Sequence, residues 1–489
     1  MKRQSLLLMA LTWVVGTLAQ EQPTLAFPTA EGFGKYASGG RGGKVVEVTN
    51  LNDAGEGSLR WALTEAGKEN ATIVFRVSGI IDIGPNPQRK GERSIRAKLK
   101  NVTIAGQTAP GEGILLRGGK LNLGGSENVI IRNIRARLGT KGDPGKTKKE
   151  NFIEGGAIGI ENAQRIIIDH CCFGWSGEEN MTMYDNHYTT VQWCIVHEGL
   201  HDAGHHKGVR GYGAQWGGSP ATFHHNLLCS NDSRSARING ATNPKVDKNA
   251  FLEYQNNVNF NWGRRNSCYG GENEAGEGSS HECNFVGNYY KPGPAHPEDN
   301  VFIELSAARK GKQLTGPSLW YFSGNVMEGQ KGADDWQLVS NKTGFAEEQM
   351  KAVQPLVKAG YEAYLTPAES AKKAYKQVLK RAGTVRRDVV EQRIIDDVRT
   401  GRPRYQGKSA GKAGIIDSQA DAEGWPQYAT ATPAADRDHD GMADEWELKH
   451  GFSPADAQDG NRVVSKEGYT ALEVYLCSLM GEKIAMDKK

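Results

Sequence analysis

The sequence lacks a marked excess of charge of either sign, and it lacks long apolar runs beyond its N-terminal segment. Its 60 Lys and Arg residues against 57 Asp and Glu leave a net charge of only +3. This balance excludes a histone-like polycation and an acidic solvating tail, so we expect no nucleic-acid partner. No later stretch is long enough to span a bilayer, so we expect no stable membrane insertion.

Cysteine is also scarce. The seven cysteines are an odd number, too few for a disulfide scaffold in 489 residues, and they show no C-x-x-C spacing typical of a zinc site. We expect most of them to be small buried side chains. Cys268 and Cys283 are the one pair that we consider for a disulfide.

The N-terminus has the pattern of an export signal. Lys2 and Arg3 precede an apolar run over 6–15, and small residues follow as far as Ala19. This pattern predicts a signal peptide at 1–19, with a membrane anchor as the less favoured alternative because the run is short. We therefore expect an exported protein, periplasmic or extracellular.

From about residue 40 to 330, short β-branched strands alternate with Asn or other small residues, and no amphipathic helix interrupts them. Representative strands are 101–104, 128–131, 165–168, 188–191, 221–223, 251–254 and 319–322. The positions that follow them recur at intervals of 24 to 37 residues: Asn133, His170, Cys194, Asn226, Asn256, Asn288 and Asn325. Such a period is typical of stacked coils. We predict an all-β fold, a right-handed single-stranded parallel β-helix over 26–343, with an ordinary β-sandwich as the alternative.

Helix-forming residues become frequent beyond residue 345. The run Thr366-Pro-Ala-Glu369 has the pattern of a capping box and predicts a helix start, and a second helix is predicted over 388–398. We expect 344–400 to form a helical extension that packs on the β-helix. Residues 401–434, rich in Gly, Ala and polar residues, are predicted to be an extended connector.

The C-terminal segment 435–489 contains an EF-hand-like calcium loop. Oxygen donors occupy loop positions 1, 3, 5, 7, 9 and 12, and Gly441 occupies position 6, where the chain must turn sharply. The predicted ligands are Asp436, Asp438, Asp440, the carbonyl of Met442, Asp444 and Glu447. We predict a structural Ca²⁺ site followed by a helix over 444–450, with a solvated acidic turn as the alternative.

Several short motifs occur in a characteristic order. AFPTAEGFG and SGGRGGKVVEVTNLNDAGEGSLRWAL lie within 26–63, and IAGQ at 104–107, IDHC at 168–171 and FHHN at 223–226 follow. Over residues 26 to 400 the chain resembles bacterial pectate lyases of polysaccharide lyase family 1. The resemblance implies a parallel β-helix that cleaves galacturonan by Ca²⁺-assisted β-elimination. The partner would be a pectic polysaccharide such as polygalacturonate, and we expect a monomer.

β-Elimination needs a base beside the proton α to a carboxylate, together with cations that stabilise the developing negative charge. By the resemblance, Arg234 matches the catalytic arginine, and Lys207 and Arg237 match substrate-binding residues. Further cations nearby are Arg210, Arg264 and Arg265. Because positive neighbours favour a neutral guanidine, an alkaline optimum is expected. The alternative for Arg234 is a structural ion pair.

The catalytic calcium site is less complete than the resemblance implies. Glu154 and Glu178 fall where the family carries carboxylate ligands, and Glu179 is a further candidate. Gly156 and Thr182 stand where additional acidic residues would be expected. We therefore expect calcium binding here to be weak or dependent on substrate.

Two other functions remain open at this stage. A β-helical glycoside hydrolase would need carboxylates on both sides of the scissile bond, and Glu178 with Glu179 is the only pair in this region. A non-catalytic pectin-binding solenoid would need no base. The histidines, for which substrate contact or loop packing is favoured over zinc, are His197, His201, His205 and His206. The aromatics that could stack on sugars or belong to the core are Trp175, Tyr212, Trp216 and Trp262.

Overall fold

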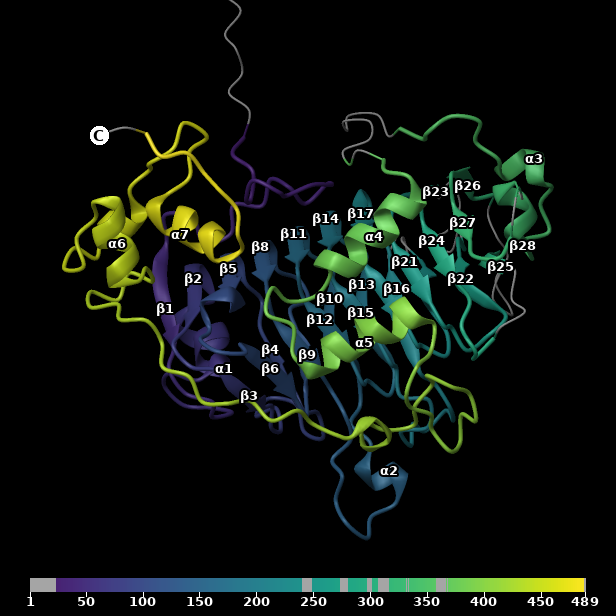
Figure 1. The fold of residues 1–489 in the computed structure, drawn as a ribbon, viewed down its shortest axis with the longest axis horizontal. Helices are drawn as coiled ribbons and strands as arrows, with labels where there is room; N and C mark the ends of the chain where they lie inside the picture. Colours follow the sequence, from purple (N-terminus) through teal and green to yellow (C-terminus); the bar gives the residue numbers. More distant parts are fainter. Residues whose placement is uncertain are drawn as a thin grey trace, which may run out of the picture.

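A computed structural model of the chain describes residues 23–239, 249–272, 280–296, 301–306, 316–330, 332, 334–357, 366 and 368–487. The predicted signal peptide lies outside these residues. The chain winds into an elongated coil in which each strand pairs in parallel with the strand one turn later (Figure 1). The predicted right-handed parallel β-helix is confirmed, and the β-sandwich is excluded.

Three sheets form the walls of the coil. The ten-stranded sheet contains β1 (Lys44–Val48), β2 (Glu69–Phe75), β5 (Lys100–Ala105), β8 (Glu127–Arg132), β11 (Gln164–Asp169), β14 (His187–Gln192), β17 (Ala221–His224), β20 (Asn249–Gln255), β23 (Ser280–Val286) and β26 (Leu319–Ser323). The second, called the cleft sheet here, contains β4 (Ser94–Arg96), β7 (Lys120–Asn122), β10 (Ile158–Glu161), β13 (Glu179–Tyr184), β16 (Tyr212–Trp216), β19 (Arg237–Ile238), β22 (Asn266–Gly270), β25 (Val301–Leu305) and β28 (Val339–Asn341). The third, called the helix-covered sheet, contains β3 (Gly79–Asp82), β6 (Ile114–Arg117), β9 (Arg135–Arg137), β12 (Cys172–Gly174), β15 (Ile195–His197), β18 (Leu227–Cys229), β21 (Val258–Phe260), β24 (Tyr289–Lys291) and β27 (Val326–Met327).

The helices are short, and those near the start of the chain add Leu59, Ala62 and Leu63 to the interior core of the first turns. The α-helices are α1 (Leu59–Trp61), α2 (Lys148–Asn151), α3 (Glu347–Met350), α4 (Ala371–Arg381), α5 (Val389–Thr400), α6 (Asp444–His450) and α7 (Ala471–Leu479). Single turns of other helix types are η1 (Ala62–Ala66), η2 (Gly106–Thr108), η3 (Asp335–Leu338), η4 (Gln419–Ala422) and η5 (Asp459–Asn461). Within the described residues no helix is both long and apolar enough to cross a membrane.

The predicted bend positions belong to two different sets of equivalent residues. One set is the residue directly after each strand, and the other is the residue after that. Asn133, His170 and Asn256 adopt the left-handed conformation directly after strands of the ten-stranded sheet. Asn226 and Asn288 come one residue later and belong to an internal ladder, in which each side chain accepts from the backbone N–H of the ladder residue one turn earlier. The equivalent bend after β14 is therefore Trp193, not Cys194. The interval from His170 to Trp193 is then 23 residues, so the shortest interval in the pattern reflects a short turn of the coil and not the shift.

The interior is mainly apolar, and the buried polar side chains of this asparagine ladder are hydrogen-bonded. Stacked aromatic rings, such as Trp216 on Phe223 with centroids 4.7 Å apart, fill the wide turns. Trp175, Trp216 and Trp262 are at most 1 % exposed, which excludes them as sugar platforms. All cysteines are buried and free, so the bridge between Cys268 and Cys283 considered above is wrong. The two lie on neighbouring sheets, where Cys268 packs against the carbonyl of Ser235 instead.

Helices α4 and α5 lie along the helix-covered sheet (Figure 1). Their apolar faces, including Val378 and Ile394, pack on Ile195 and Leu227 of that sheet. The helix predicted from Thr366 begins later, because Ser370 provides the N-terminal cap of α4. The prediction for α5 is confirmed, with Asp388 as its cap.

Buried ion pairs fix α5 to the coil. Arg137 contacts Asp388 at 2.6 Å, Arg135 contacts Glu391, and Arg393 contacts Glu198. Removing one partner of such a pair leaves an uncompensated buried charge, at a cost of about 3 to 5 kcal/mol. The Arg137 guanidinium holds the pKa of Asp388 well below its usual range, although burial acts in the opposite direction.

We expect Asp388→Asn to destabilise the fold by about 3 to 5 kcal/mol at neutral pH, since Asn still caps α5 but leaves Arg137 unpaired. Because the folded pKa of Asp388 is lowered, its contribution is complete above the unfolded value of about 4 and is lost as the pH falls below it. Urea unfolding of both proteins at pH 7 and pH 3 measures this. A difference in stability that does not shrink at pH 3 would contradict the assignment.

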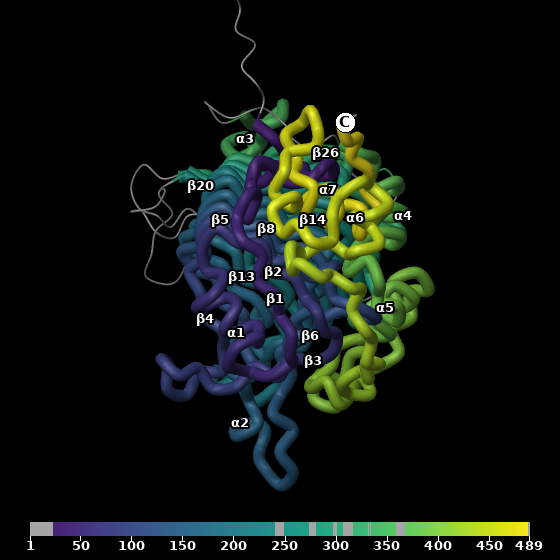
Figure 2. Tube along the Cα trace, turned by 90° about the vertical axis from the view of Figure 1, so that its left-hand side faces the viewer, coloured from purple at the N-terminus to yellow at the C-terminus, as the bar shows by residue number. Residues whose placement is uncertain are grey.

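The C-terminal unit, η5 with α6 and α7, covers the first turns of the coil (Figures 1 and 2). Met442 and Leu472 pack with Val45 and Ala105, which belong to β1 and β5. Arg76 lies 3.3 Å from Glu47 of β1 and 3.5 Å from Asp436 of the acidic loop. The segment that carries the predicted calcium loop thus packs on the outer face of the first strands of the ten-stranded sheet.

Candidate active site

A cavity of about 470 Å³ lies over the middle of the cleft sheet. Its walls are ionic and aromatic side chains from successive turns: Glu178, Glu179, Lys207, Arg210, Tyr212, Arg234, Arg237, Tyr269 and Glu272. Parallel pairing brings them together, since Glu179 is in register with Tyr212, and Arg237 with Tyr269. Adjacent strands are about 4.8 Å apart, so residues distant in sequence share one surface.

Arg234 lines this cavity from the turn before β19. Its backbone is left-handed, with φ of 61°. The guanidinium lies 4.3 Å from the centroid of the Tyr212 ring and forms an ion pair with Glu179. Its Nε is buried without a hydrogen-bond partner in the part of the chain that the structure describes. The ion pair that was the alternative role predicted for Arg234 is therefore present in the structure.

The environment of Arg234 acts on its protonation in two directions. Burial lowers the pKa of Arg234 below its usual range, and the charge of Arg237 lowers it further. Tyr269 and Glu272 act in the opposite direction. The ion pair with Glu179 also favours the charged form, so the loss of that partner would favour the neutral guanidine.

Each carboxylate in the cavity has a cationic or imidazole partner. Glu178 accepts from His205 Nε2 at 2.7 Å, and the proton is on that nitrogen because Nδ1 accepts from the backbone N–H of Lys207. Glu272 accepts from Arg237 at 3.1 Å. A catalytic cation must compete with these partners or arrive with additional oxygen ligands.

The predicted substrate-binding cations lie at different depths. Arg237 is buried, whereas Arg210 donates to the Tyr212 hydroxyl at 2.9 Å and Lys207 is exposed. Arg264 lies at the rim, 3.0 Å from Asp232 and 5.8 Å from the centroid of the Tyr212 ring. Arg265 is exposed and does not line the cavity.

Of the carboxylates predicted to bind the catalytic Ca²⁺, one does not reach the cavity. Glu154 is exposed, in the loop between α2 and β10, and does not line the cavity. A Cβ atom at Gly156 would lie 2.1 Å from the carbonyl oxygen of Glu179, so the backbone leaves no room for an aspartate there. Glu178 and Glu179 therefore remain as the predicted ligands that face the cavity.

Sequence reasoning missed two residues that line the cavity. Tyr269 and Glu272 both contact Arg237, through the ring face and the carboxylate. The signal in the sequence was their position one turn after Arg237, which becomes readable only when the register of β19 and β22 is known.

The histidines considered for zinc serve packing and hydrogen bonding. His197 is buried beside Glu198, and His201 lies 3.5 Å from Asp232. His205 holds Glu178 and stacks on His206, with centroids 4.3 Å apart. Among the described residues these histidines are in no cluster with metal-binding geometry.

A second cluster of carboxylates lies in the C-terminal unit. Asp436, Asp438 and Asp440 converge, and Asp440 also converges with Glu447 and Asp459. Glu447 is 0 % exposed, and neither of its carboxylate oxygens has a hydrogen-bond partner within the described residues. Burial and the neighbouring Asp440 raise the pKa of Glu447 to about 8. This donor set suits Ca²⁺, which prefers carboxylate oxygens.

The loop differs from the predicted ligand pattern at one position. Asp444 lies outside both carboxylate clusters, because it accepts from the backbone and the guanidinium of Arg437. Asp459, at the start of η5, lies in the cluster instead. Gly441 has φ of 90°, which explains glycine at the sharp turn.

A larger cavity, of about 850 Å³, lies between the turn joining α4 to α5 and the C-terminal segment. It contains basic residues such as Arg381 and Arg386, and also His170 of the IDHC motif, but none of the predicted catalytic, substrate-binding or metal-binding residues. The cleft with Arg234 is therefore the better candidate for chemistry.

Comparison with known proteins agrees with this reading. Over 466 residues the chain is 33 % identical to the probable pectate lyase C of Aspergillus fumigatus, covering 93 % of this chain and 94 % of that protein. Over 483 residues it is 31 % identical to the probable pectate lyase C of Aspergillus terreus, covering 96 % and 98 %. No family model matches.

A solved structure shares the fold. The crystal structure of Jun a 1, the major allergen from cedar pollen, matches with a TM-score of 0.50 and 16 % identity over 73 % of this chain and 93 % of that one. The parallel β-helix with its ionic cleft and these relatives define a polysaccharide lyase. The chain belongs to the pectate lyase family. The relatives named here are fungal, so they do not support a likeness specific to bacterial enzymes.

Proposed function

We propose that the chain cleaves α-1,4-linked polygalacturonan by Ca²⁺-assisted β-elimination, with Arg234 as the general base. The observation that carries the proposal is the partly buried Arg234 guanidinium, which lines the cleft beside Lys207, Arg210 and Arg237. The exposed and half-buried cations around it suit a polyanionic chain of sugars.

The cleft residues divide the work between binding and proton transfer. Lys207, Arg210 and Arg237 bind uronate carboxylates, with Arg264 and Arg265 at or beyond the rim. The neutral guanidine of Arg234 takes the proton from the carbon α to the carboxylate. The electron pair of that bond forms the new double bond, and the glycosidic oxygen leaves and gains a proton from water.

Glu178 and Glu179 are the residues that would hold a catalytic Ca²⁺, together with carboxylates of the substrate. Such an ion would neutralise the uronate carboxylate and stabilise the charge that develops on the α-carbon. The two protein ligands are few for an ion that takes six to eight oxygens, so binding would depend on substrate. Glu154 has no part in this proposal, because it is exposed and outside the cavity.

A structural Ca²⁺ site in the C-terminal loop is also proposed. Its ligands are Asp436, Asp438, Asp440, the Met442 carbonyl, Glu447 and Asp459. Its role is to hold the C-terminal unit against the first turns of the coil, since Met442 packs with residues of β1 and β5.

The remaining features of the proposal concern the setting of the enzyme. We propose that it is exported to the periplasm or the extracellular space, acts as a monomer and has no nucleic-acid partner. We also propose four parts of the mature chain: the β-helix over 26–343, the helical extension over 344–400, the connector over 401–434 and the calcium-binding segment over 435–489.

The expected product distinguishes elimination from hydrolysis. Digestion of polygalacturonate should raise the ultraviolet absorbance, because the new double bond is conjugated with the carboxylate. The rate should rise with pH through the alkaline range, since the base must be neutral and burial lowers the pKa of Arg234 from its usual range. Release of reducing ends without a rise in absorbance would indicate a hydrolase and would contradict the proposal.

A further inference from the structure

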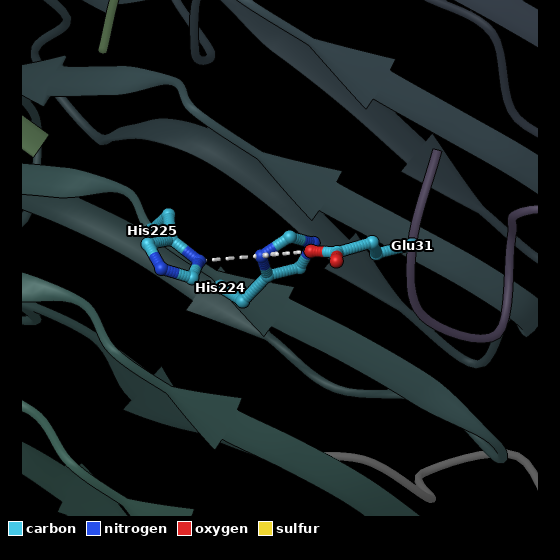
Figure 3. Close-up of side chains that lie close together, drawn as sticks. All are labelled: Glu31, His224 and His225. Atoms are coloured by element: carbon cyan, nitrogen blue, oxygen red, sulfur yellow. Dashed lines mark hydrogen bonds and ion pairs between the residues drawn. The ribbon is translucent and has the colours of Figure 1, made fainter. Parts of the chain in front are cut away.

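Two adjacent histidines and a glutamate form a polar cluster on the ten-stranded sheet, away from the cleft (Figure 3). His224 ends β17, His225 follows it, and Glu31 comes from the N-terminal segment that crosses this sheet. The Nδ1 atoms of the two histidines are 2.8 Å apart, and Glu31 Oε2 is 3.8 Å from His224 Nδ1. One ligand atom from each residue lies within 4.8 Å of the others.

Hydrogen bonds fix the tautomer of His224. The Gln192 side-chain nitrogen donates to Asp169 Oδ1 at 2.8 Å and to the Thr29 carbonyl at 3.2 Å. Its oxygen therefore accepts, from the Glu31 backbone N–H at 3.1 Å and from His224 Nε2 at 3.2 Å. The proton of His224 is thus on Nε2, and Nδ1 presents a lone pair to the cluster.

The outer nitrogen of His225, Nε2, also faces a side-chain oxygen. This nitrogen lies 3.9 Å from Glu369 Oε2, an oxygen that is buried without a hydrogen-bond partner in the described part of the chain. This distance is too long for a hydrogen bond, so it does not fix the tautomer: a proton on Nε2 leaves the Nδ1 lone pair directed at His224, whereas a proton on Nδ1 would make a hydrogen bond between the two rings. Two lone pairs at 2.8 Å repel each other unless a cation lies between them.

The burial of the cluster suits a metal ion. His224 and His225 are 0 % and 4 % exposed, and burial favours neutral imidazole, the form that ligates metals. The Glu31 side chain is 37 % exposed, which gives an ion a path from solvent. Two imidazoles and one carboxylate are ligands of zinc-like ions, whereas Ca²⁺ prefers oxygens alone.

We propose that Glu31, His224 and His225 bind one divalent transition-metal ion of the zinc class, with solvent at the fourth position. Zinc–nitrogen bonds of about 2.0 to 2.1 Å place tetrahedral ligands about 3.4 Å apart, so the rings separate slightly on binding. Gln192 then holds the outer nitrogen of His224, and Glu369 faces the outer nitrogen of His225 at 3.9 Å, as amides and carboxylates do around metal-bound histidines.

The positive charge of Arg381 should weaken the binding of a cation at this site. Its removal therefore offers a variant with the opposite effect to the removal of Glu31. The Arg381 guanidinium lies 3.9 Å from the centroid of the Trp193 ring, and Trp193 stacks on His225 with centroids 4.3 Å apart. Arg381 is exposed, so solvent screens its charge in part. Arg381→Gln should therefore strengthen metal binding, whereas Glu31→Gln should weaken it.

The test is a Co²⁺ titration of the full chain, followed by visible absorbance and by calorimetric competition with Zn²⁺. The protein is first stripped of transition metals and kept in excess Ca²⁺, so that the C-terminal carboxylates are filled. We expect one equivalent of Co²⁺ with the absorbance of a four-coordinate site. Glu31→Gln should weaken binding at least tenfold, His225→Gln should abolish it, and His187→Gln, at the start of β14, should leave it unchanged.

Two results would overturn the proposal: no saturable Co²⁺ binding by the unaltered chain, or equal binding by Glu31→Gln. Either would mean that the two histidines share a proton only. Glu31 is partly exposed, so Glu31→Gln keeps the test valid if His225→Gln fails to fold. Retained cleavage of polygalacturonate by Glu31→Gln shows that the fold is intact, and the metal result does not depend on the proposed chemistry of the cleft.

Discussion

Replacement of Arg234 by glycine should lower the turnover of polygalacturonate by about 10² to 10⁴, the usual contribution of a general base. Glycine removes the whole side chain, and the backbone φ of 61° at this position is one that glycine adopts without strain. The loss should appear in kcat, since Lys207 and Arg210 still bind the substrate.

Chemical rescue separates a base from a structural residue. Millimolar methylguanidine should restore part of the activity of Arg234→Gly, because the vacated space adjoins the Tyr212 ring that stacks on the native guanidinium. Arg399→Ala, on the exposed end of α5, is the control for loss of an arginine and should keep full activity. Full turnover by Arg234→Gly would show that another group removes the proton.

Removal of Ca²⁺ from the C-terminal loop should produce the second large effect, a loss of stability. If free Ca²⁺ is at 100 times the dissociation constant, the bound ion contributes about 2.7 kcal/mol. Glu447→Gln and Asp459→Asn should both lower the melting temperature in Ca²⁺ and should both abolish the further rise with Ca²⁺ concentration. The reason is that the buried oxygens of Glu447 have no other partner in the described residues.

Asp444→Asn is the matched control for this experiment. Its carboxylate is engaged by Arg437 and lies outside the clusters, so the dependence of the melting temperature on Ca²⁺ should persist. If Asp444→Asn removes that dependence while Asp459→Asn keeps it, the ligand pattern read from the loop sequence is right and the structural assignment is wrong.

The repeat pattern predicted the fold because it records a repeated physical constraint. The strands that the sequence singled out, such as 165–168 and 251–254, all belong to the ten-stranded sheet. Alternate apolar residues of these strands, such as Ile166 and Ile168, belong to the interior core. The bend positions were less readable, because Asn serves both the left-handed bend at Asn256 and the internal ladder at Asn257.

The composition of the cleft was harder to predict, because it depends on register and on neighbouring turns. The sequence could not show that a side chain at Gly156 would collide with the carbonyl of Glu179. It also gave no sign that Glu272 pairs with Arg237 across two strands. In the C-terminal unit, Asp459 lies beyond the twelve-residue loop pattern, so only folding brings it to Asp440 and Glu447.

The central claim is that Arg234 removes the α-proton of a bound uronate. A crystal structure of the chain with an oligogalacturonate, soaked at acid pH where Arg234 stays protonated and turnover is slow, tests it most directly. The proposal requires the Arg234 guanidinium beside the ring carbon that bears the carboxylate, with uronates against Lys207 and Arg210. An oligosaccharide bound in the cleft with Arg234 still paired to Glu179 and turned away from that carbon would contradict it.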